Sequence, residues 1–309
     1  MNFKSLFLIG FLILFCNNIL AQNDSLKVNS KRVAIVSSSL CAALGGSYYY
    51  IQNSWWADKQ TSFHFDDGAD LTYALNVDKV GHFMGGLEAA DIFSSSMKWA
   101  GMNEKQALWY GGFFGSGLQL AIEMKDAYAP YWGFSKWDLA LGSTGAFWPV
   151  AQYYNDDLKA INFKFSYYKR SNIYWDLDAQ RGKQTNKYAW QDDYPNQTYW
   201  VTFDVNHFTE SCYWPDWLNV AIGFGIDDSQ YLPGWNEEIQ FLDSSIPNAG
   251  TKTGGKNEWY VAFDYDIPKM LKKWDSPTGK KVKHWLNYIH FPAPTIRISP
   301  KLEFYPLFL

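Results

Sequence analysis

The feature that most constrains the fold is a change in the spacing of apolar residues near residue 160. Before this point apolar and small residues recur at helical spacing, which predicts helices over 78–100, 103–127 and 135–155. After it, apolar residues alternate with polar or small ones, as in strands with two unlike faces. We therefore predict an α+β fold, in which an N-terminal apolar bundle of about four helices is followed by an antiparallel β-sheet or partial barrel packed on it.

The alternation defines four clear strands and a weaker fifth. In the clearest, Leu218, Val220 and Ile222 point to one side while Asn219 and Ala221 point to the other. The predicted strands are 161–167, 199–205, 218–227 and 259–267, with the weaker one around Ile296 and Ile298.

Two environments explain such a pattern: lipid outside a polar lumen, or apolar helices on one face of a sheet and water on the other. We favour the second, because a barrel of the outer-membrane type needs about eight strands. The expected sheet then turns its large apolar residues toward the helices and its small or polar residues toward water.

The first 21 residues have the features of a secretory signal peptide. Lys4 precedes an uncharged apolar run over 6–15, and small residues lead to Ala21, after which we expect cleavage. Cys16 lies inside the apolar region and follows Phe15, so we do not predict a lipid-attachment cysteine. The expected divisions are a signal peptide over 1–21, a helical domain over 22–160 and an antiparallel β region over 161–309.

The aromatic composition is typical of proteins that contact a membrane, and also of proteins with an aromatic core or a glycan-binding surface. Aromatic residues make up 19% of the chain, and such amphipathic rings collect at membrane interfaces, in aromatic cores and on glycan-binding surfaces. The uncharged stretch 33–51, opened by Lys31 and Arg32, is long enough to span a bilayer or to form a buried helix. Lysines beside tryptophans over 269–274 and 280–290 predict short amphipathic helices that suit an anionic membrane surface or a solvated face.

Charge and cysteine content exclude other classes. A net charge of −4 offers no basic field, so nucleic-acid binding is not expected. Beyond the signal peptide only Cys41 and Cys212 remain, and we expect free thiols rather than a disulfide framework. His207, His284 and His290 adjoin aromatic residues, and we expect them to be packed or hydrogen-bonded rather than to bind metal.

Five ionisable residues of the helical half form the candidate site. Asp78 and His82 are four residues apart and share a helix face, and Glu123 and Asp126 share another. Asp138 follows on the next predicted helix. Buried carboxylates and imidazoles are costly unless paired, and they are often functional. We therefore expect these five side chains to converge.

These residues lie in an ordered set of motifs. The motifs are Asp78-Lys79-Val80-Gly81-His82-Phe83, Glu123-Met124-Lys125-Asp126 and Gly133-Phe134-Ser135-Lys136-Trp137-Asp138, followed by Gly142, Thr144 and Gly145. Over 78–154 this set resembles the YfiM-like family of predicted periplasmic lipoproteins and, more distantly, the VanZ-like membrane proteins. The resemblance implies an envelope location and no established reaction. Because a usable lipidation cysteine is not predicted, we expect any anchoring to come from the protein surface.

Two functions fit the five residues. In the catalytic hypothesis, His82 is a general acid or base oriented by Asp78, within a membrane-bound hydrolase that acts on a lipid or cell-wall phosphate. A divalent cation is then held by Glu123, Asp126 and Asp138. In the architectural hypothesis, the residues form a hydrogen-bond network that fixes helix register, and the protein is a structural or lipid-contacting envelope component.

We favour the architectural hypothesis, because the sequence has no nucleophile elbow, phosphate-binding glycine loop or cysteine metal spacing. The expected partners are membrane lipid or envelope proteins. The expected location is the periplasmic side of the outer membrane or the outer membrane itself.

Overall fold

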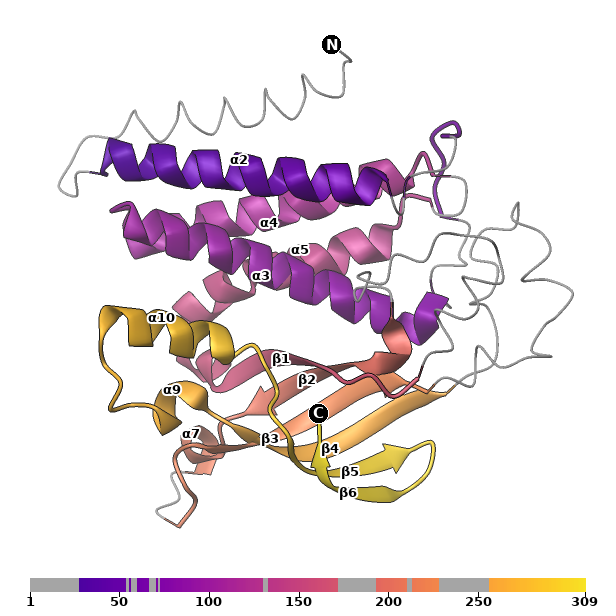
Figure 1. Cartoon of the computed structure of the whole chain (residues 1–309), viewed down its shortest axis with the longest axis vertical. Helices are drawn as coiled ribbons and strands as arrows, with labels where there is room; N and C mark the ends of the chain where they lie inside the picture. Colours follow the sequence, from indigo (N-terminus) through magenta and orange to yellow (C-terminus); the bar gives the residue numbers. More distant parts are fainter. Residues whose placement is uncertain are drawn as a thin grey trace, which may run out of the picture.

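A computed structural model describes residues 28–53, 56, 60–66, 71, 73–129, 133–171, 193–209, 213–227 and 256–309. These residues form an α+β fold in which a helical N-terminal region is stacked on an antiparallel sheet (Figure 1). The predicted signal peptide and Cys212 lie outside the described residues.

Four long helices make up the N-terminal region, as predicted. Asn29, Asn103 and Ser135 begin three of them, and each side chain accepts a hydrogen bond from a backbone N–H of the first turn. The helices are α2 (Ser30–Gln52), α3 (Val77–Trp99), α4 (Glu104–Asp126) and α5 (Lys136–Tyr154). The last three agree with the predicted ranges to within one residue at each end.

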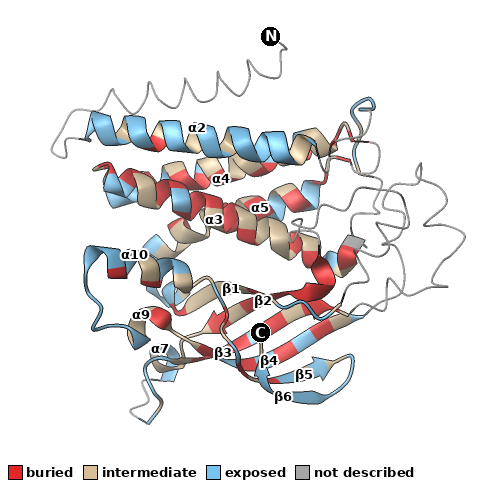
Figure 2. Ribbon diagram, in the orientation of Figure 1, coloured by how far each residue is buried: buried red, intermediate tan, exposed pale blue. Residues whose placement is uncertain are grey.

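Helix α2 is mostly exposed, and Val36 is its one buried residue (Figure 2). Val36 packs against Phe93 and Met97 of α3, whereas Cys41 is an exposed free thiol, as predicted. The prediction of a buried helix over 33–51 is therefore wrong, because α2 touches the bundle along a single narrow edge. Among the described helices, none combines the length and the apolar character needed to cross a membrane.

The second half of the chain forms a six-stranded antiparallel meander in which each strand pairs with the next. Five strands coincide with the predicted ones, and the aromatic C-terminus adds a sixth. The strands are β1 (Ile161–Tyr167), β2 (Gln197–Phe203), β3 (Leu218–Ile226), β4 (Asn257–Tyr265), β5 (Ala293–Ser299) and β6 (Glu303–Phe308). Shorter helices are η2 (Tyr73–Asn76), η3 (Asp156–Ala160), η4 (Tyr194–Asn196), α7 (Val205–Thr209), α9 (Ile267–Met270) and α10 (Pro277–Leu286).

The sheet curls, and the segment that leads into β5 returns to the outer edge of β1. The Phe165 N–H donates to the Tyr288 carbonyl at 2.8 Å, and the His290 N–H donates to the Phe165 carbonyl at 3.0 Å. These bonds satisfy backbone groups that an edge strand would otherwise expose. They also help to enclose one face of the sheet.

The enclosed face is the polar one, so the prediction that it faces water is wrong. Along β4, Glu258, Tyr260 and Asp264 are buried, whereas Trp259 and Val261 are exposed. Alternation along a strand separates two faces but does not say which face is covered. Here the curl covers the polar face, and its polar groups pair with one another.

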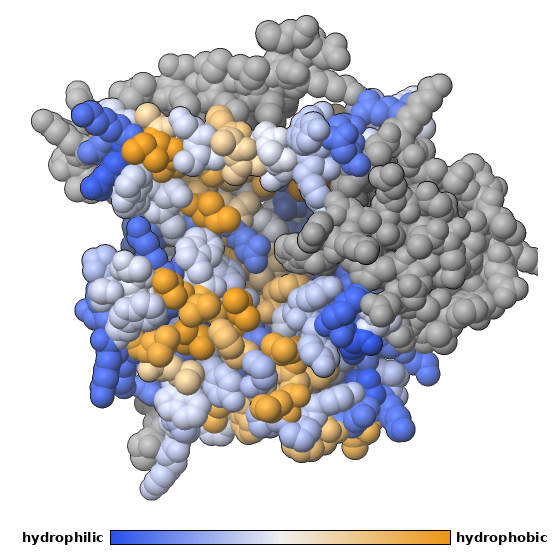
Figure 3. Space-filling model, viewed as in Figure 1, coloured by the Kyte–Doolittle hydropathy of each residue, from blue (hydrophilic) through white to orange (hydrophobic). Residues whose placement is uncertain are grey.

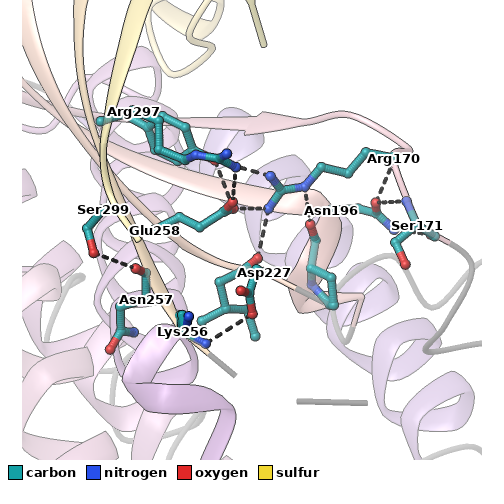
Figure 4. A network of polar contacts seen from close by, with 12 residues as sticks. Arg170, Ser171, Asn196, Asp227, Lys256, Asn257, Glu258, Arg297 and Ser299 are labelled. Atoms are coloured by element: carbon teal, nitrogen blue, oxygen red, sulfur yellow. Dashed lines mark hydrogen bonds and ion pairs between the residues drawn. The ribbon is translucent and has the colours of Figure 1, made fainter. Parts of the chain in front are cut away.

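One such pairing is a network around Glu258 (Figure 4). Its carboxylate accepts hydrogen bonds from Arg170 and from Arg297, the latter at 2.8 Å. The Tyr260 hydroxyl donates to the same carboxylate at 2.8 Å. Charge-assisted hydrogen bonds to both oxygens offset the desolvation of the buried Glu258. We call these four residues the sheet network.

A second pairing lies deeper on the same face. The ammonium of Lys164 is 2.8 Å from the Asp264 carboxylate and donates to the Tyr265 carbonyl at 2.7 Å. His290 makes a hydrogen bond of 3.1 Å with Asp264 and stacks on the ring of Trp200 at 3.9 Å between ring centroids. The prediction that His290 is packed and hydrogen-bonded is confirmed.

The apolar face of the sheet is covered by the bundle near β1, β2 and β3. Phe83 of α3 packs on Phe163 of β1, with ring centroids 4.5 Å apart. The buried residues of this core are Ala74, Val77, Met84, Leu87, Tyr194, Tyr199 and Ile226. The sheet is therefore packed on the helices, as predicted, but only over part of this face.

Among the described residues, no helix covers the rest of the apolar face. Four side chains stand next to one another across β3, β4, β5 and β6 in the strand register. They are Ile222, Val261, Ile296 and Phe304, with exposed fractions of 41%, 39%, 43% and 62%. We call them the outer apolar row. Figure 3 shows hydrophobic side chains on the molecular surface at the level of the sheet and the C-terminal helices.

Candidate functional site

Glycines bring α3, α4 and α5 into backbone contact. A Cβ added to Gly86 would lie 1.9 Å from the Gly142 carbonyl oxygen, and one added to Gly145 would lie 1.9 Å from that of Phe83. A Cβ on Gly115 would lie 2.7 Å from the Gly86 oxygen. Such distances leave room only for hydrogen, so small residues set the helix separation. This approach brings polar side chains of three helices together.

The predicted site residues meet where these helices cross. His82 Nε2 lies 3.8 Å from Asp78 Oδ1 and 4.0 Å from Asp138 Oδ2, and His82 Nδ1 lies 3.9 Å from Glu123 Oε1. Asp126, one turn beyond Glu123, accepts a hydrogen bond of 2.6 Å from the Trp56 indole instead. Four of the five residues therefore form one cluster, and Asp126 lies beside it. We call Asp78, His82, Glu123 and Asp138 the bundle cluster.

An unusual turn places Asp78. Ala74, Leu75 and Asn76 have φ angles of 44°, 48° and 69°, a left-handed conformation that non-glycine residues seldom adopt. Ala74 is fully buried in the core between bundle and sheet, and the Asn257 side chain of β4 donates to the Leu75 carbonyl at 3.0 Å. The sheet thus stabilises the turn from which α3 begins.

Three residues that sequence reasoning missed complete the surroundings. The buried ammonium of Lys79 lies 3.2 Å from Asp138 Oδ1 and 3.7 Å from Asp78 Oδ2. The side-chain oxygen of Gln119 accepts a hydrogen bond of 2.8 Å from His82 Nδ1, and the Tyr194 hydroxyl donates to Asp78 Oδ1 at 2.8 Å. Lys79 lies inside the first motif, so the sequence could have identified it as a member of the site. Tyr194 comes from a distant segment, and no sequence pattern connects it with the site.

Glu123 is bound mainly to the backbone. Its Oε2 accepts the Ser135 N–H at 2.8 Å, and the Ser135 hydroxyl in turn caps α5 by accepting the Asp138 N–H at 3.1 Å. Glu123 therefore ties α4 to the first turn of α5, which fixes the register of two helices. This is the role that the architectural hypothesis gives to the cluster.

Burial and neighbouring charges shift the pKa values of Glu123, Asp126 and His82. Burial raises the pKa of Glu123 to about 9 and that of Asp126 to about 7. Burial alone lowers the pKa of His82, but the charges of Asp78, Asp138 and Glu123 outweigh it and raise that pKa to about 9. In this state Glu123 is neutral near pH 7, whereas His82 carries a proton.

The cluster is only partly open. The His82 and Asp78 side chains are 17% and 15% exposed, whereas that of Glu123 is 2% exposed. His82 and Asp78 are thus the members that a solute reaches first. Within the described residues, His82, Asp78 and Asp138 each offer one ligand atom within 4.8 Å of the others, an arrangement able to hold a metal ion. This trio differs from the predicted one of Glu123, Asp126 and Asp138.

The remaining histidines fulfil structural expectations. His284 of α10 makes a hydrogen bond of 2.6 Å with Asp91 of α3, and the Tyr288 hydroxyl donates to the same carboxylate at 2.7 Å. His207 makes one of 2.9 Å with Asp157. The prediction that these histidines are hydrogen-bonded is confirmed, and the Asp91 contacts attach the C-terminal helix to the bundle.

Comparison with known proteins gives one match. Residues 65–153 match the model of a family described as a predicted periplasmic lipoprotein (DUF2279), and the segment contains all five predicted site residues. The match covers less than a third of the 309-residue chain. No curated protein and no solved structure matches the chain significantly. The family match supports an exported, periplasmic protein of the cell envelope whose biochemical role is not established.

Proposed function

We propose that the protein is a structural, lipid-contacting component of the cell envelope. In this proposal it lies on an anionic membrane surface at the periplasmic side of the outer membrane, and its outer apolar row faces the lipid. The observation that carries the proposal is the orientation of the sheet, which buries its polar face and leaves large apolar residues exposed over β3 to β6.

Such an orientation is costly in water alone. Burying the polar face requires paired charges such as Lys164 with Asp264, whereas exposing Val261, Ile296 and Phe304 forgoes hydrophobic stabilisation. Contiguous exposed apolar side chains commonly mark membrane or protein contact sites. A lipid surface would remove the outer apolar row from water without disturbing the polar interior.

Charge favours an anionic lipid over a neutral one. Residues 256–309 contain nine lysines and arginines against five aspartates and glutamates, although the whole chain has a net charge of −4. Lys272 and Lys280 form ion pairs with aspartates, but Lys273 and Lys281 form none within the described residues. Exposed tryptophans accompany them, and this combination is typical of interfacial helices.

The likeness of residues 78–154 to YfiM-like and VanZ-like proteins supports the same proposal, since both groups belong to the envelope. Direct attachment to another envelope protein is the competing explanation of the exposed row.

Vesicle binding tests the proposal. The purified protein is mixed with phosphatidylglycerol vesicles or with phosphatidylcholine vesicles, and the bound fraction is measured by flotation. We expect binding to phosphatidylglycerol that is at least about tenfold stronger, because lysines near an anionic surface each contribute about 1 kcal/mol. Absence of binding to either vesicle would overturn the proposal and leave a protein partner as the explanation.

Two sets of variants separate the apolar and the charged contributions. The triple variant Val261→Ser, Ile296→Ser and Phe304→Ser should lose binding to phosphatidylglycerol, whereas Ile35→Ser, at an exposed apolar side chain of α2 outside the row, should not. Lys273→Gln with Lys281→Gln should weaken binding severalfold, whereas Lys105→Gln on α4 should leave it unchanged. Circular dichroism checks that each variant is folded.

A further inference from the structure

The bundle cluster contains a gap between one imidazole nitrogen and two carboxylates. His82 Nδ1 is hydrogen-bonded to the Gln119 side-chain oxygen at 2.8 Å, so this nitrogen carries the ring proton of a neutral imidazole. The other nitrogen, Nε2, faces Asp78 Oδ1 at 3.8 Å and Asp138 Oδ2 at 4.0 Å. These distances exceed those of hydrogen bonds, which are about 2.7–3.2 Å.

Lys79 orients the carboxylates of Asp78 and Asp138 from the side opposite His82. Lys79 lies nearest to Asp138 Oδ1 and Asp78 Oδ2, which are the oxygens that point away from His82. Each of the two carboxylates therefore directs one oxygen toward the Lys79 ammonium and the other toward His82 Nε2. The Tyr194 hydroxyl also holds Asp78 in place. When His82 is neutral, the single positive charge of Lys79 faces the two negative charges of Asp78 and Asp138, so a cation can take the place of the proton on His82.

The histidine is oriented as metal-binding histidines usually are. Such a residue donates its second ring N–H to a carbonyl or carboxylate, which leaves the other nitrogen for the metal. Gln119 provides that acceptor and is itself buried beneath Gly142, where a Cβ would lie 2.5 Å from the Gln119 side chain. The backbone at Gly142 thus packs directly on the Gln119 side chain, and a residue larger than glycine at position 142 would displace the acceptor.

We propose that His82 Nε2, Asp78 Oδ1 and Asp138 Oδ2 bind a divalent transition-metal cation. One nitrogen and two carboxylate oxygens suit Zn²⁺ or Mn²⁺, with water completing the coordination. Ligands about 2.0–2.2 Å from such an ion lie about 3.3–3.6 Å apart in tetrahedral geometry, so His82 Nε2 approaches each carboxylate oxygen by a few tenths of an ångström on binding. The two carboxylate oxygens, which lie within 4.8 Å of each other, close to the same separation. Glu123 is not part of this trio, because its Oε2 binds the Ser135 N–H and its Oε1 faces Nδ1, the other nitrogen of His82. This site is independent of the lipid contact proposed above.

Calorimetric titration of chelator-treated protein with Zn²⁺ and with Mn²⁺ tests the site. We expect one ion per chain for at least one metal, and we expect His82→Gln to weaken its affinity at least about 100-fold. Gln119→Leu leaves all three ligands in place and should weaken it about 10- to 100-fold. The matched control is His284→Gln. His284 makes a direct hydrogen bond of 2.6 Å with the Asp91 carboxylate, so its replacement should not affect binding of the ion.

A second measurement uses the wild-type protein alone, so it tests the site even where a variant fails to fold. Co²⁺ added to the wild-type protein should give the visible absorption of a four- or five-coordinate ion, and Zn²⁺ should abolish that absorption by displacement. Failure of the wild-type protein to take up Zn²⁺, Mn²⁺ or Co²⁺ stoichiometrically would overturn the proposal. Unchanged affinity in a folded His82→Gln variant would do the same.

Discussion

The bundle cluster and the sheet network are both groups of buried charges, but they are satisfied in different ways. In the sheet network, Glu258 receives direct hydrogen bonds from Arg170, Arg297 and Tyr260. In the bundle cluster, His82 lies 3.8–4.0 Å from three carboxyl groups, and among the described residues its direct hydrogen bond is to Gln119. The sheet network thus uses its charges to stabilise the fold, whereas the bundle cluster holds protons near pH 7 that it can release.

The strongest test of this difference removes the central carboxylate of the sheet network. Glu258→Gln leaves two guanidinium groups without their buried counter-charge and should lower the free energy of unfolding by about 3 kcal/mol or more, measured by urea denaturation. Glu303→Gln is the control, since that half-exposed side chain accepts hydrogen bonds from Arg297 and Tyr305 near the solvent and should cost less than about 1 kcal/mol. Equal losses would mean that burial of Glu258 has no special importance.

The next largest effect concerns the helix contact that forms the bundle cluster. Gly145→Ala places a Cβ 1.9 Å from the Phe83 carbonyl oxygen, so α3 and α5 must separate at a cost of about 2 kcal/mol. Thermal unfolding measures the loss, and metal titration should show weaker binding in the same variant. Gly45→Ala on α2 meets no atom within 4 Å and should instead stabilise the helix by about 0.5–1 kcal/mol.

Dependence on pH distinguishes the two groups directly. In chelator-treated protein, His82 has a pKa of about 9 against 6.5 when unfolded, so its stabilising effect is complete below pH 6.5 and is lost toward pH 9. Glu123 acts in the same direction, since the folded state keeps a proton that the unfolded chain releases near pH 4.5. We expect the free energy of unfolding to fall by about 1 kcal/mol or more between pH 6.5 and 9.

His82→Gln should reduce this slope to the part that Glu123 contributes. Variants of the sheet network should leave the slope in place, because the pKa values of Arg170 and Arg297 are raised further above this range. Stability that rises between pH 6.5 and 9 in the wild-type protein would contradict the charge state assigned to His82.

The smallest expected effect comes from one hydroxyl at the edge of the bundle cluster. Tyr194→Phe removes the donor to Asp78 Oδ1 and should cost about 1 kcal/mol in denaturant titrations. Tyr213→Phe, at a residue that is 95% exposed, should change stability by less than about 0.5 kcal/mol. Indistinguishable variants would show that the Tyr194 contact adds nothing to folding.

Local patterns were enough to predict most of the elements and part of the site. Helical spacing placed α3, α4 and α5, and the twofold alternation placed five of the six strands. The i, i+4 spacing of Asp78 and His82 placed both on one helix face, and the packing of α3, α4 and α5 brought Glu123 and Asp138 to them. The short β6 was missed because Pro306 and the consecutive large residues on either side of it break the alternation.

Other features depended on contacts between distant segments. The sequence determined that each strand has an apolar and a polar face, because side chains alternate along an extended backbone. Only the tertiary structure decided that the polar face lies inside, since this follows from the return of residues 288–290 to β1. In the same way, motif spacing determined which charges meet in the bundle, but Gln119 and Tyr194 decided how His82 and Asp78 are oriented, because hydrogen-bond partners from other elements are set by packing.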